Sequence, residues 1–537
     1  MPRYAYEPFP YRTPPELGGG KPLRRPVVIV GAGPVGLAAA VDCALHGVPC
    51  IVLDDNNVVS LGSRAICWSK RTLEIFDRLG VGARMVEKGV TWKVGRLFHR
   101  DREVWNFDLL PETGHRMPAF VNLQQYYVEQ YLVERASDFP DLIDLRWKNR
   151  VTGIKQSGDG VSAAVSTPDG DYTIEADWLI ACDGARSPLR TMMGLDFIGS
   201  EFEERFLIAD VEMKADFPSE RWFWFEPPFH NGQSALLHKQ PDNIYRIDLQ
   251  LGWDADPEEE KKPENVIPRI EKVIGHSSFE LDWVSVYSFQ CRRLERFVHD
   301  RVVFAGDSAH IVSPFGARGG NGGIQDVDNL VWKLALVVKG EAPANLIATY
   351  DEERVHGADE NIVNSARATA FMTPKSGMER LFRDSVLELA GEHEFARRLV
   401  NSGRLSRPCS LAGMSLQTHA AADGGLAPGA AMADAPVANG GGAWLLPHFG
   451  GRFAVMAVEA DIPPELPRGV DAVFVTRDPA RRINGAATLI DAEGLVAGRY
   501  GAGNTYLIRP DQHVAARFRG ASAADLAAAH RRAIGCV

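Results

Sequence analysis

Three glycines stand in the most informative segment of the chain, VVIVGAGPVG at Val27–Gly36. Gly31 allows a tight turn out of the preceding apolar run, Gly33 lets a pyrophosphate approach the backbone, and Gly36 allows close helix packing. The helix that follows offers free N–H groups to phosphate. Asp54 lies 18 residues beyond Gly36, where a carboxylate can bind a ribose hydroxyl. The pattern predicts a dinucleotide site in preference to a glycine-rich turn without a ligand.

Two later segments each carry a carboxylate directly after an apolar run. They are LIACDGARSPLR, at Leu179–Arg190, and RVVFAGDSAHIVSPFGARGGN, at Arg301–Asn321. Alone, the first of these is more simply explained by an ordinary strand and turn. In the second, consecutive glycines precede a helix, and their exposed N–H groups suit a ring that gains negative charge. The candidate residues in the two segments are Asp183, Asp307, Pro314, Gly319, Gly320 and Asn321.

Together and in this order, the three segments resemble the FAD site of the single-component flavoprotein aromatic hydroxylases, the group that contains p-hydroxybenzoate hydroxylase. The resemblance implies that the Asp183 region borders both FAD and the nicotinamide donor and that Asp307 binds the ribityl chain. It also implies FAD contacts for Arg64, Gln125 and the backbone of Val151. An exposed arginine and a helix-capping glutamine are the ordinary alternatives for the first two.

The resemblance implies a reaction as well as a cofactor. NADH or NADPH reduces FAD, the reduced flavin and O2 form a C4a-hydroperoxide, and its terminal oxygen attacks an electron-rich phenolic ring. The chain has no second glycine-rich unit for NAD(P)H, which fits transient binding of the donor. No proton-transfer residue stands out, so the catalytic side chains stay unknown. Many relatives carry Gly-Gln-Gly where this chain has Ala317-Arg318-Gly319, so a relative's substrate does not transfer.

Three alternative functions stay open. The same flavin chemistry could act by epoxidation or Baeyer-Villiger insertion on a polyketide-type or non-aromatic substrate. Trp222–Pro227 resembles the Trp-x-Trp-x-Ile-Pro signature of flavin-dependent halogenases, except at Glu226. A non-enzymatic FAD-binding scaffold would leave the acids Asp183 and Asp307 without a purpose.

Hydrophobic patterns predict the elements that position these residues. Val27–Val30, Leu37–His46 and Cys50–Leu53 predict strand, helix and strand, the opening of a Rossmann-type α/β fold. Alternating and aromatic runs from Phe202 to Gln290 predict an inserted, mostly antiparallel substrate-domain sheet. The predicted regions are an N-terminal arm (1–25), an FAD-binding domain (26–200 and 291–400), the substrate domain (201–290), a connector (401–442) and a C-terminal α/β module (443–537).

Substrate contacts are expected from the inserted sheet. In the aromatic run Arg221–Phe225, alternation puts the two tryptophans on one face and the other three residues on the opposite face. A second strand carries a phenol, a guanidinium and a carboxylate, which could bind a phenolic or carboxylate group. Core packing and a surface ladder are the ordinary alternatives. The substrate candidates are Trp222, Trp224, Tyr245, Arg246 and Asp248.

Three short segments, Gly62–Ala65, Asn122–Tyr127 and Gly357–Asn364, resemble the branch related to 3-(3-hydroxyphenyl)propionate hydroxylase and phenol hydroxylase. The C-terminal module, with Leu426–Gly429 and Gly498–Arg509, resembles the thioredoxin-like domain of those relatives. It lacks a CxxC, so disulfide exchange is not expected. The resemblance implies a role in structure or dimer contact, and hence a homodimer.

Composition narrows the possible partners. The net charge of −11 argues against nucleic acid or an anionic membrane. The apolar runs are too short to span a bilayer, and the N-terminus lacks a secretory apolar stretch, so a cytoplasmic protein is expected. Seven cysteines without CxxC or metal spacing predict no metal site. The expected partners are a small aromatic substrate and O2.

Overall fold

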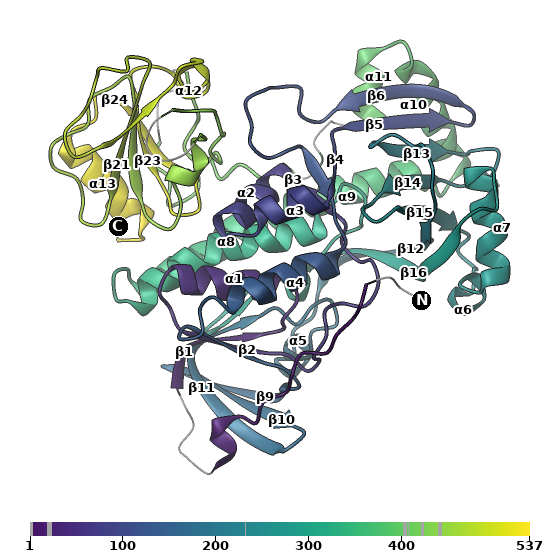
Figure 1. The fold of residues 1–537 in the computed structure, drawn as a ribbon, viewed down its shortest axis with the longest axis horizontal. Helices are drawn as coiled ribbons and strands as arrows, with labels where there is room; N and C mark the ends of the chain where they lie inside the picture. Colours follow the sequence, from purple (N-terminus) through teal and green to yellow (C-terminus); the bar gives the residue numbers. More distant parts are fainter. Residues whose placement is uncertain are drawn as a thin grey trace.

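The computed structural model describes residues 4–18, 24–230, 232–400, 405, 407–419, 424–438 and 443–536. The predicted arm and connector therefore lie partly outside the described residues. Figure 1 shows a lower α/β layer, a second sheet at the upper right and the C-terminal module at the upper left. None of the helices in the described ranges combines the length and apolar content that a bilayer crossing requires.

The first sheet is the predicted Rossmann-type core. Its parallel strands, in spatial order, are β18 (Val302–Phe304), β11 (Gly170–Ala181), β1 (Arg24–Val30), β2 (Cys50–Leu53) and β8 (Ile143–Arg146). The antiparallel strands β9 (Arg150–Ser157), β10 (Gly160–Thr167) and β17 (Val298–His299) extend it. The helices α1 (Pro34–Leu45), α4 (Gln125–Ala136) and α8 (Gly319–Val338) pack together above the sheet (Figure 1). Val28, Ile29, Val52 and Leu179 are buried on both faces, as parallel strands require.

The second sheet is the predicted inserted one, here called the substrate sheet. Its strands, in spatial order, are β19 (His310–Ile311), β16 (Glu280–Arg293), β12 (Ile198–Glu212), β15 (Ile244–Leu251), β14 (Ala235–Lys239), β13 (Arg221–Phe225), β5 (Val94–His99) and β6 (Arg102–Asp108). Most pairs are antiparallel, but β13 pairs with β5 in parallel. The sheet therefore includes a hairpin that precedes the predicted 201–290 range by about a hundred residues. On its outer face lies α7 (Pro263–Ile274).

A small third sheet joins the two larger ones. It consists of β3 (Cys67–Ser69), β7 (Phe120–Asn122) and β4 (Val90–Trp92). The helices α2 (Lys70–Arg78) and α3 (Gly82–Lys88) follow β3. The helices α9 (Ala348–Met372), α10 (Gly377–Ala390) and α11 (Glu394–Val400) follow α8 in the chain.

The C-terminal module contains a mixed five-stranded sheet. Its strands are β22 (Ala487–Ile490), β21 (Asp471–Thr476), β20 (Ala454–Val458), β23 (Asn504–Ile508) and β24 (Val514–Arg519), accompanied by α12 (Leu495–Tyr500) and α13 (Ala523–Ala533). The first three strands run parallel, and β23 and β24 pair antiparallel. The module packs on the first domain, where Trp332 of α8 meets Phe453 edge to face at 5.6 Å between ring centroids.

The described part of the N-terminal arm is extended and packs against the first domain. The hydroxyl of Tyr6 accepts the N–H of Gly62 at 3.0 Å, and Phe9 stacks on Trp147 at 4.6 Å. The arm ends in the short 3-10 helix η1 (Pro15–Gly18). In Figure 1 this purple segment runs from the substrate sheet down past β9 and β10.

Candidate FAD and substrate site

The glycine-rich turn after β1 has the geometry that a pyrophosphate site needs. Gly31 has a φ of 105°, and a Cβ there would lie 2.4 Å from the carbonyl oxygen of Cys182. A Cβ on Gly36 would lie 1.9 Å from the oxygen of Gly31, so a side chain is excluded. At Gly33, the N-cap of α1, nothing lies within 4 Å of a Cβ, and no side chain caps the helix. The first-turn N–H groups are therefore free for an anion, and the residues fit FAD phosphates.

Asp54 lies directly beside this turn. Its Oδ2 accepts the N–H of Ala32 at 2.6 Å, and its Oδ1 accepts the N–H of Asn56 at 2.8 Å. Burial raises the pKa of Asp54, and the two N–H groups oppose that rise. The Asp54 carbonyl accepts the N–H of Asn149 at 2.7 Å, which places the start of β9, with buried Val151, next to the predicted ribose site.

Asp183 and Arg190 connect the second segment with the third. Oδ2 of Asp183 accepts the N–H of Leu189 at 3.0 Å, whereas its buried Oδ1 has no hydrogen-bond partner among the described residues. A buried carboxylate oxygen without a partner is costly unless a ligand satisfies it. Arg190 donates to the carbonyls of Ala185 at 2.7 Å and Ser308 at 3.1 Å. This arginine therefore clamps the two predicted FAD segments together.

Asp307 is exposed to solvent beside a buried network of hydrogen bonds and ion pairs. Desolvation by surrounding protein raises the pKa of Asp307 even though water reaches its side chain. Behind it, Asp326 accepts the N–H of Gly306 at 2.9 Å, His310 Nε2 lies 2.7 Å from Asp326 Oδ2, and Arg354 Nε lies 2.7 Å from Oδ1. Burial alone would raise the pKa of Asp326, but His310 and Arg354 outweigh burial and lower it to about 2. The ionised Asp326 thus holds the turn that presents Asp307.

The segment from Pro314 to Asn321, here called the flavin loop, ends in the first turn of α8, where Asn321 anchors it. Gly319 and Gly320 therefore begin the helix, whereas the sequence predicts that they precede it. The amide nitrogen of Asn321 donates to the carbonyls of Cys67 at 2.8 Å and Ala317 at 2.6 Å, and its oxygen accepts the N–H of Ser69 at 2.9 Å. Pro314 is exposed, and its carbonyl accepts the N–H of Ala317 at 3.0 Å. A Cβ on Gly320 would lie 3.3 Å from Trp68, and one on Gly319 would lie 4.0 Å from Oδ1 of Asp307.

Gln125 holds the loop that carries Arg64. Its Nε2 donates to Ser60 Oγ at 2.9 Å and to Glu129 Oε1 at 2.8 Å, and its Oε1 accepts the N–H of Ala65 at 3.2 Å. Both ends of this amide are therefore already used within the protein. The side chain of Arg64 is exposed, and its carbonyl accepts Nη1 of Arg246 at 2.8 Å. That contact joins the substrate sheet to the first domain.

The substrate sheet presents two chemically different faces. Phe223 and Phe225 belong to the apolar cluster that includes Phe315 of the flavin loop, so their face is the inner one. Trp222 and Trp224 pack instead into the cluster that contains Val266 and Ile270 of α7. The structure therefore confirms the alternation but places the two tryptophans on the outer face, away from the flavin loop.

The remaining substrate candidates divide in the same way. Tyr245 is also on the outer face, where its hydroxyl donates to the carbonyl of Ala215 at 2.8 Å. Arg246 and Asp248 lie on the inner face and pair with each other, with Nε and Oδ1 3.0 Å apart. Of the five candidates, the structure therefore brings only Arg246 and Asp248 toward the predicted flavin site. The physical reason is that successive side chains of a strand point to opposite faces of the sheet. The pairing register of the strand therefore fixes the face of all its side chains at once.

Sequence reasoning missed a polar row that crosses the inner face. Arg221 pairs in register with His238, His238 with Arg246, and Arg246 with Asp210 on four successive strands. Asp210 accepts Nε2 of Gln240 at 3.1 Å, and burial raises the pKa of Asp210 to about 7. The signal that could have revealed Arg221 is its position two residues before Phe223, on the same face.

Comparison with known proteins decides the family. A family model described as FAD binding domain matches residues 24–365. The chain belongs to this family of FAD-dependent monooxygenases. It is 31% identical over 391 residues to the 12-dehydrotetracycline 5-monooxygenase/anhydrotetracycline 6-monooxygenase of Streptomyces rimosus subsp. rimosus, covering 70% of this chain and 75% of that protein. It is 28% identical over 363 residues to a 3-(3-hydroxy-phenyl)propionate/3-hydroxycinnamic acid hydroxylase of Mycolicibacterium smegmatis, covering 67% and 64%.

A solved structure shows the same overall fold. The flavin-dependent monooxygenase PieE, in complex with FAD and substrate, superposes with a TM-score of 0.79 at 22% identity. The match covers 96% of this chain and 100% of that one. The agreement therefore extends over the FAD-binding domain, the substrate sheet and the C-terminal module.

Two residues of the flavin loop, Ala317 and Arg318, differ from the Gly-Gln that the sequence resemblance leads one to expect. Ala317 has a φ of 53°, a left-handed conformation that glycine adopts without strain and alanine does not. Arg318 is buried, and its Nη1 donates to Asn361 Oδ1 of α9 at 3.0 Å. Arg318 thus ties the flavin loop to α9.

One group of possible metal ligands occurs in the described part of the chain, outside the FAD site. It consists of His99, Glu226 and Asp384. Arg383 already pairs with Glu226 and, at 2.8 Å, with Asp384. Because an arginine neutralises both carboxylates, the group resembles a structural ion-pair cluster more than a cation site.

Proposed function

We propose that this FAD-dependent monooxygenase uses NADH or NADPH and O2 to hydroxylate a phenolic aromatic substrate. The observation that carries the proposal is the hydrogen bond from Arg246 to the carbonyl of Arg64. It sets the polar inner face of the substrate sheet against the loop predicted to lie beside the flavin. A polar row flanked by Phe223 and Phe315 suits a ring with oxygen substituents.

The chain's own groups bind, orient and exclude water in this proposal. Bound FAD supplies the electron transfer and oxygen chemistry that side chains lack. The turn at Gly31–Gly36 holds phosphates, and Asp307 orients the cofactor from the end of β18. The aromatic cluster around Phe315 keeps water from the reacting centre. His238 is neutral because burial lowers its pKa well below the usual value, so its ring offers one hydrogen-bond donor and one acceptor at the inner face.

A polyketide-type substrate is the second candidate, and one observation favours it. The relative from Streptomyces rimosus is named for tetracycline-type substrates. Oxygen insertion or epoxidation on such a substrate would use the same FAD residues. The halogenase alternative loses its support, because Trp222 and Trp224 lie on the outer face.

The finer organisation belongs to the same proposal. We infer that the module from 443 onward is thioredoxin-like and serves structure or dimer contact, and that the protein acts as a homodimer in the cytoplasm. Its mixed sheet, with three parallel strands and an antiparallel pair, supports a thioredoxin-like arrangement. We propose the domain limits that the sequence predicts, with the β5–β6 hairpin added to the substrate domain.

The test is NAD(P)H oxidation by the FAD-loaded protein with a panel of phenols, phenylpropanoids and hydroxybenzoates, with oxygen uptake and product mass followed together. A compound that speeds oxidation and gains one oxygen atom supports aromatic hydroxylation. If no aromatic compound stimulates NAD(P)H oxidation while a polyketide gains oxygen, oxygenation of a polyketide-type substrate replaces aromatic hydroxylation as the proposed function.

A further inference from the structure

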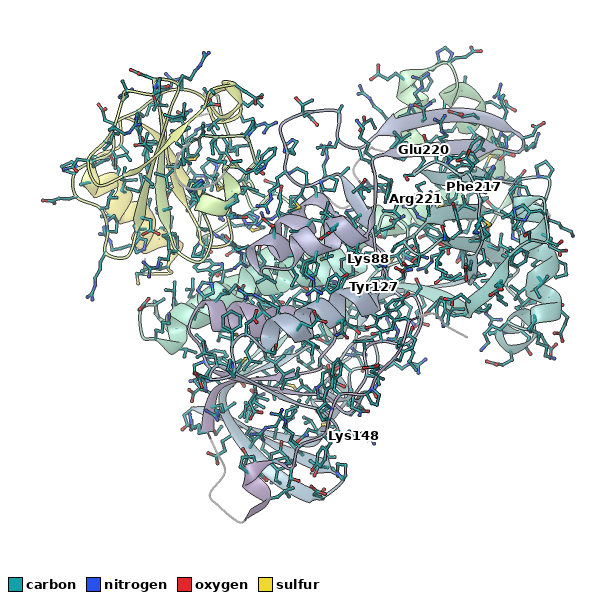
Figure 2. All side chains as sticks on the ribbon, viewed as in Figure 1. Lys88, Tyr127, Lys148, Phe217, Glu220 and Arg221 are labelled. Atoms are coloured by element: carbon teal, nitrogen blue, oxygen red, sulfur yellow. The ribbon has the colours of Figure 1, made fainter. Side chains whose placement is uncertain are left out.

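Arg221 is a charged side chain without a protein partner on the inner face of the substrate sheet. It makes no hydrogen bond or ion pair with any residue that the structure describes, and it is half-buried. Desolvation lowers the pKa of Arg221, although some solvent contact remains. Figure 2 labels Arg221 at the end of β13 that is nearer to the helices of the FAD-binding domain. An uncompensated cation in such a place is costly to the free protein.

The neighbours of Arg221 do not supply its counter-charge. Asp248 acts on it electrostatically but is bonded to Arg246. Burial raises the pKa of Cys67 to about 11, so this thiol is neutral near pH 7. His238, its register partner on β14, is also neutral because burial lowers its pKa. Among the described residues, the one carboxylate near Arg221 is therefore shared with Arg246, and Arg221 has no carboxylate bonded to it.

The surroundings of Arg221 are also aromatic and lie next to the flavin loop. Gly95, its partner on β5, has no side chain, and the ring of Phe107 covers that position, 2.3 Å from where a Cβ would stand. Phe223 lies on the same face two residues away. Cys67 links this corner to the flavin loop, because its Sγ is 4.0 Å from His238 Nδ1 and it packs in one cluster with Ala317.

We propose that Arg221 binds the carboxylate of the substrate, and that the substrate class is therefore aromatic acids. This inference rests on the proposed hydroxylation and names its substrate class. The planar guanidinium fork matches a carboxylate in a two-point contact, and the adjacent phenylalanine rings accept an aromatic ring. A phenolate oxygen shares this chemistry, but it offers one acceptor atom where a carboxylate offers two.

The experiment measures binding by calorimetry to the FAD-loaded protein, independently of turnover. The probes are 3-hydroxybenzoate, 3-(3-hydroxyphenyl)propionate and 3-hydroxycinnamate, each beside its primary amide, and phenol. The variants are Arg221→Gln, Arg221→Lys and a control, Arg96→Gln. Arg96 pairs in register with Trp222 on the outer side and is already bonded to Glu220 and Glu103.

We expect at least one acid to bind about 10- to 100-fold more tightly than its amide, the range of a hydrogen-bonded charge pair. Arg221→Gln removes that difference, Arg221→Lys keeps part of it, and Arg96→Gln leaves it unchanged. The ligand-free Arg221→Gln protein also melts no lower than the wild type, because no protein contact is lost. Equal binding of acids and amides, binding of phenol alone, or no binding of any acid overturns the proposal. The proposal is also overturned if the Tm of ligand-free Arg221→Gln falls as much as it would when a buried ion pair is broken.

The two proposals fail separately. If acids bind through Arg221 but no aromatic acid stimulates NAD(P)H oxidation, the substrate class stands and the hydroxylase function falls. If neutral phenol is hydroxylated equally well by the wild type and Arg221→Gln, the function stands and the aromatic-acid class falls.

Discussion

Arg509 and Glu353 form a two-point ion pair, Nη1 to Oε1 at 2.5 Å and Nη2 to Oε2 at 2.9 Å, with both side chains fully buried. Arg509 follows β23 of the C-terminal module, and Glu353 belongs to α9. Lys333 of α8 also bonds Glu353 at 2.8 Å. The pair therefore fastens the module to the flavin domain through charges that water does not reach.

Arg509→Leu should destabilise the protein by about 3–5 kcal/mol, because two buried carboxylates lose their guanidinium partner and Glu353 keeps only Lys333 as a cation among the described residues. Urea unfolding followed by tryptophan fluorescence measures the loss, and we expect the module to separate in an earlier transition. Arg398→Ala is the control, since Arg398 and Glu394 form an exposed pair. That change should stay within about 0.5 kcal/mol. An equally small effect of Arg509→Leu would contradict the role of the pair.

Asp307→Ala should yield protein without FAD, because Asp307 is the carboxylate presented at the end of the third predicted FAD segment. The flavin-to-protein absorbance ratio after purification measures this. Asp101→Ala, at an exposed turn between β5 and β6, is the matched control and should retain the cofactor. Stoichiometric yellow flavin in the Asp307 variant would refute the assignment.

Asp326→Asn should weaken FAD binding indirectly, through the turn at Gly306 that Asp326 holds. The neutral amide leaves the buried Arg354 without its counter-ion and loosens the N–H of Gly306. We expect a stability loss of about 3 kcal/mol or more, together with a lower flavin content that high FAD concentration restores. Full stability with unchanged flavin content would show that the network does not hold the turn.

Asp210 should make stability depend on pH. Burial raises the pKa of Asp210 to about 7, so the folded protein retains a proton that the unfolded chain releases near pH 4. The free energy of unfolding should therefore fall by an amount on the order of 2–4 kcal/mol as pH rises from about 4 to 7. Above about pH 7 it should level off. In Asp210→Asn this part of the slope should disappear. Denaturant titrations at pH 4.5, 6 and 7.5 test it, and an unchanged slope would rule out Asp210 as its source.

Ala317→Gly should stabilise the flavin loop, because the left-handed φ costs alanine about 1 kcal/mol more than glycine. We expect a gain between about 0 and 1 kcal/mol by thermal melting. Ala366→Gly, within α9, has no such strain to relieve and should lose about 1 kcal/mol. If both variants lose stability equally, the conformation of Ala317 is not strained.

The local features of this fold could be predicted from the sequence. The turn at Gly31–Gly36 and the strand Arg221–Phe225 appear where glycine spacing and alternation place them, because these signals depend on neighbours in the chain. The FAD family follows from three such segments in order.

Features that depend on how the strands and helices pack against one another could not be predicted from the sequence. Alternation separates Trp222 from Arg221, but only the packing of the whole sheet decides which of them faces Phe315. The same holds for the row from Arg221 to Asp210, which forms only when the four consecutive strands β12 to β15 pair in the correct register. Asp326 offered no motif of its own, although it organises the turn at Gly306.

The parallel pair β5–β13 has a consequence for how the protein is made. The β5–β6 hairpin is complete at residue 108, but its neighbour β13 ends only at residue 225. At about 5–20 residues per second, a ribosome needs roughly 6–23 s to supply that strand. During this interval one edge of the hairpin and the apolar side chains of Leu97 and Phe107 lack their final cover. Synthesis speed across residues 109–225 therefore governs how long an aggregation-prone edge stays open.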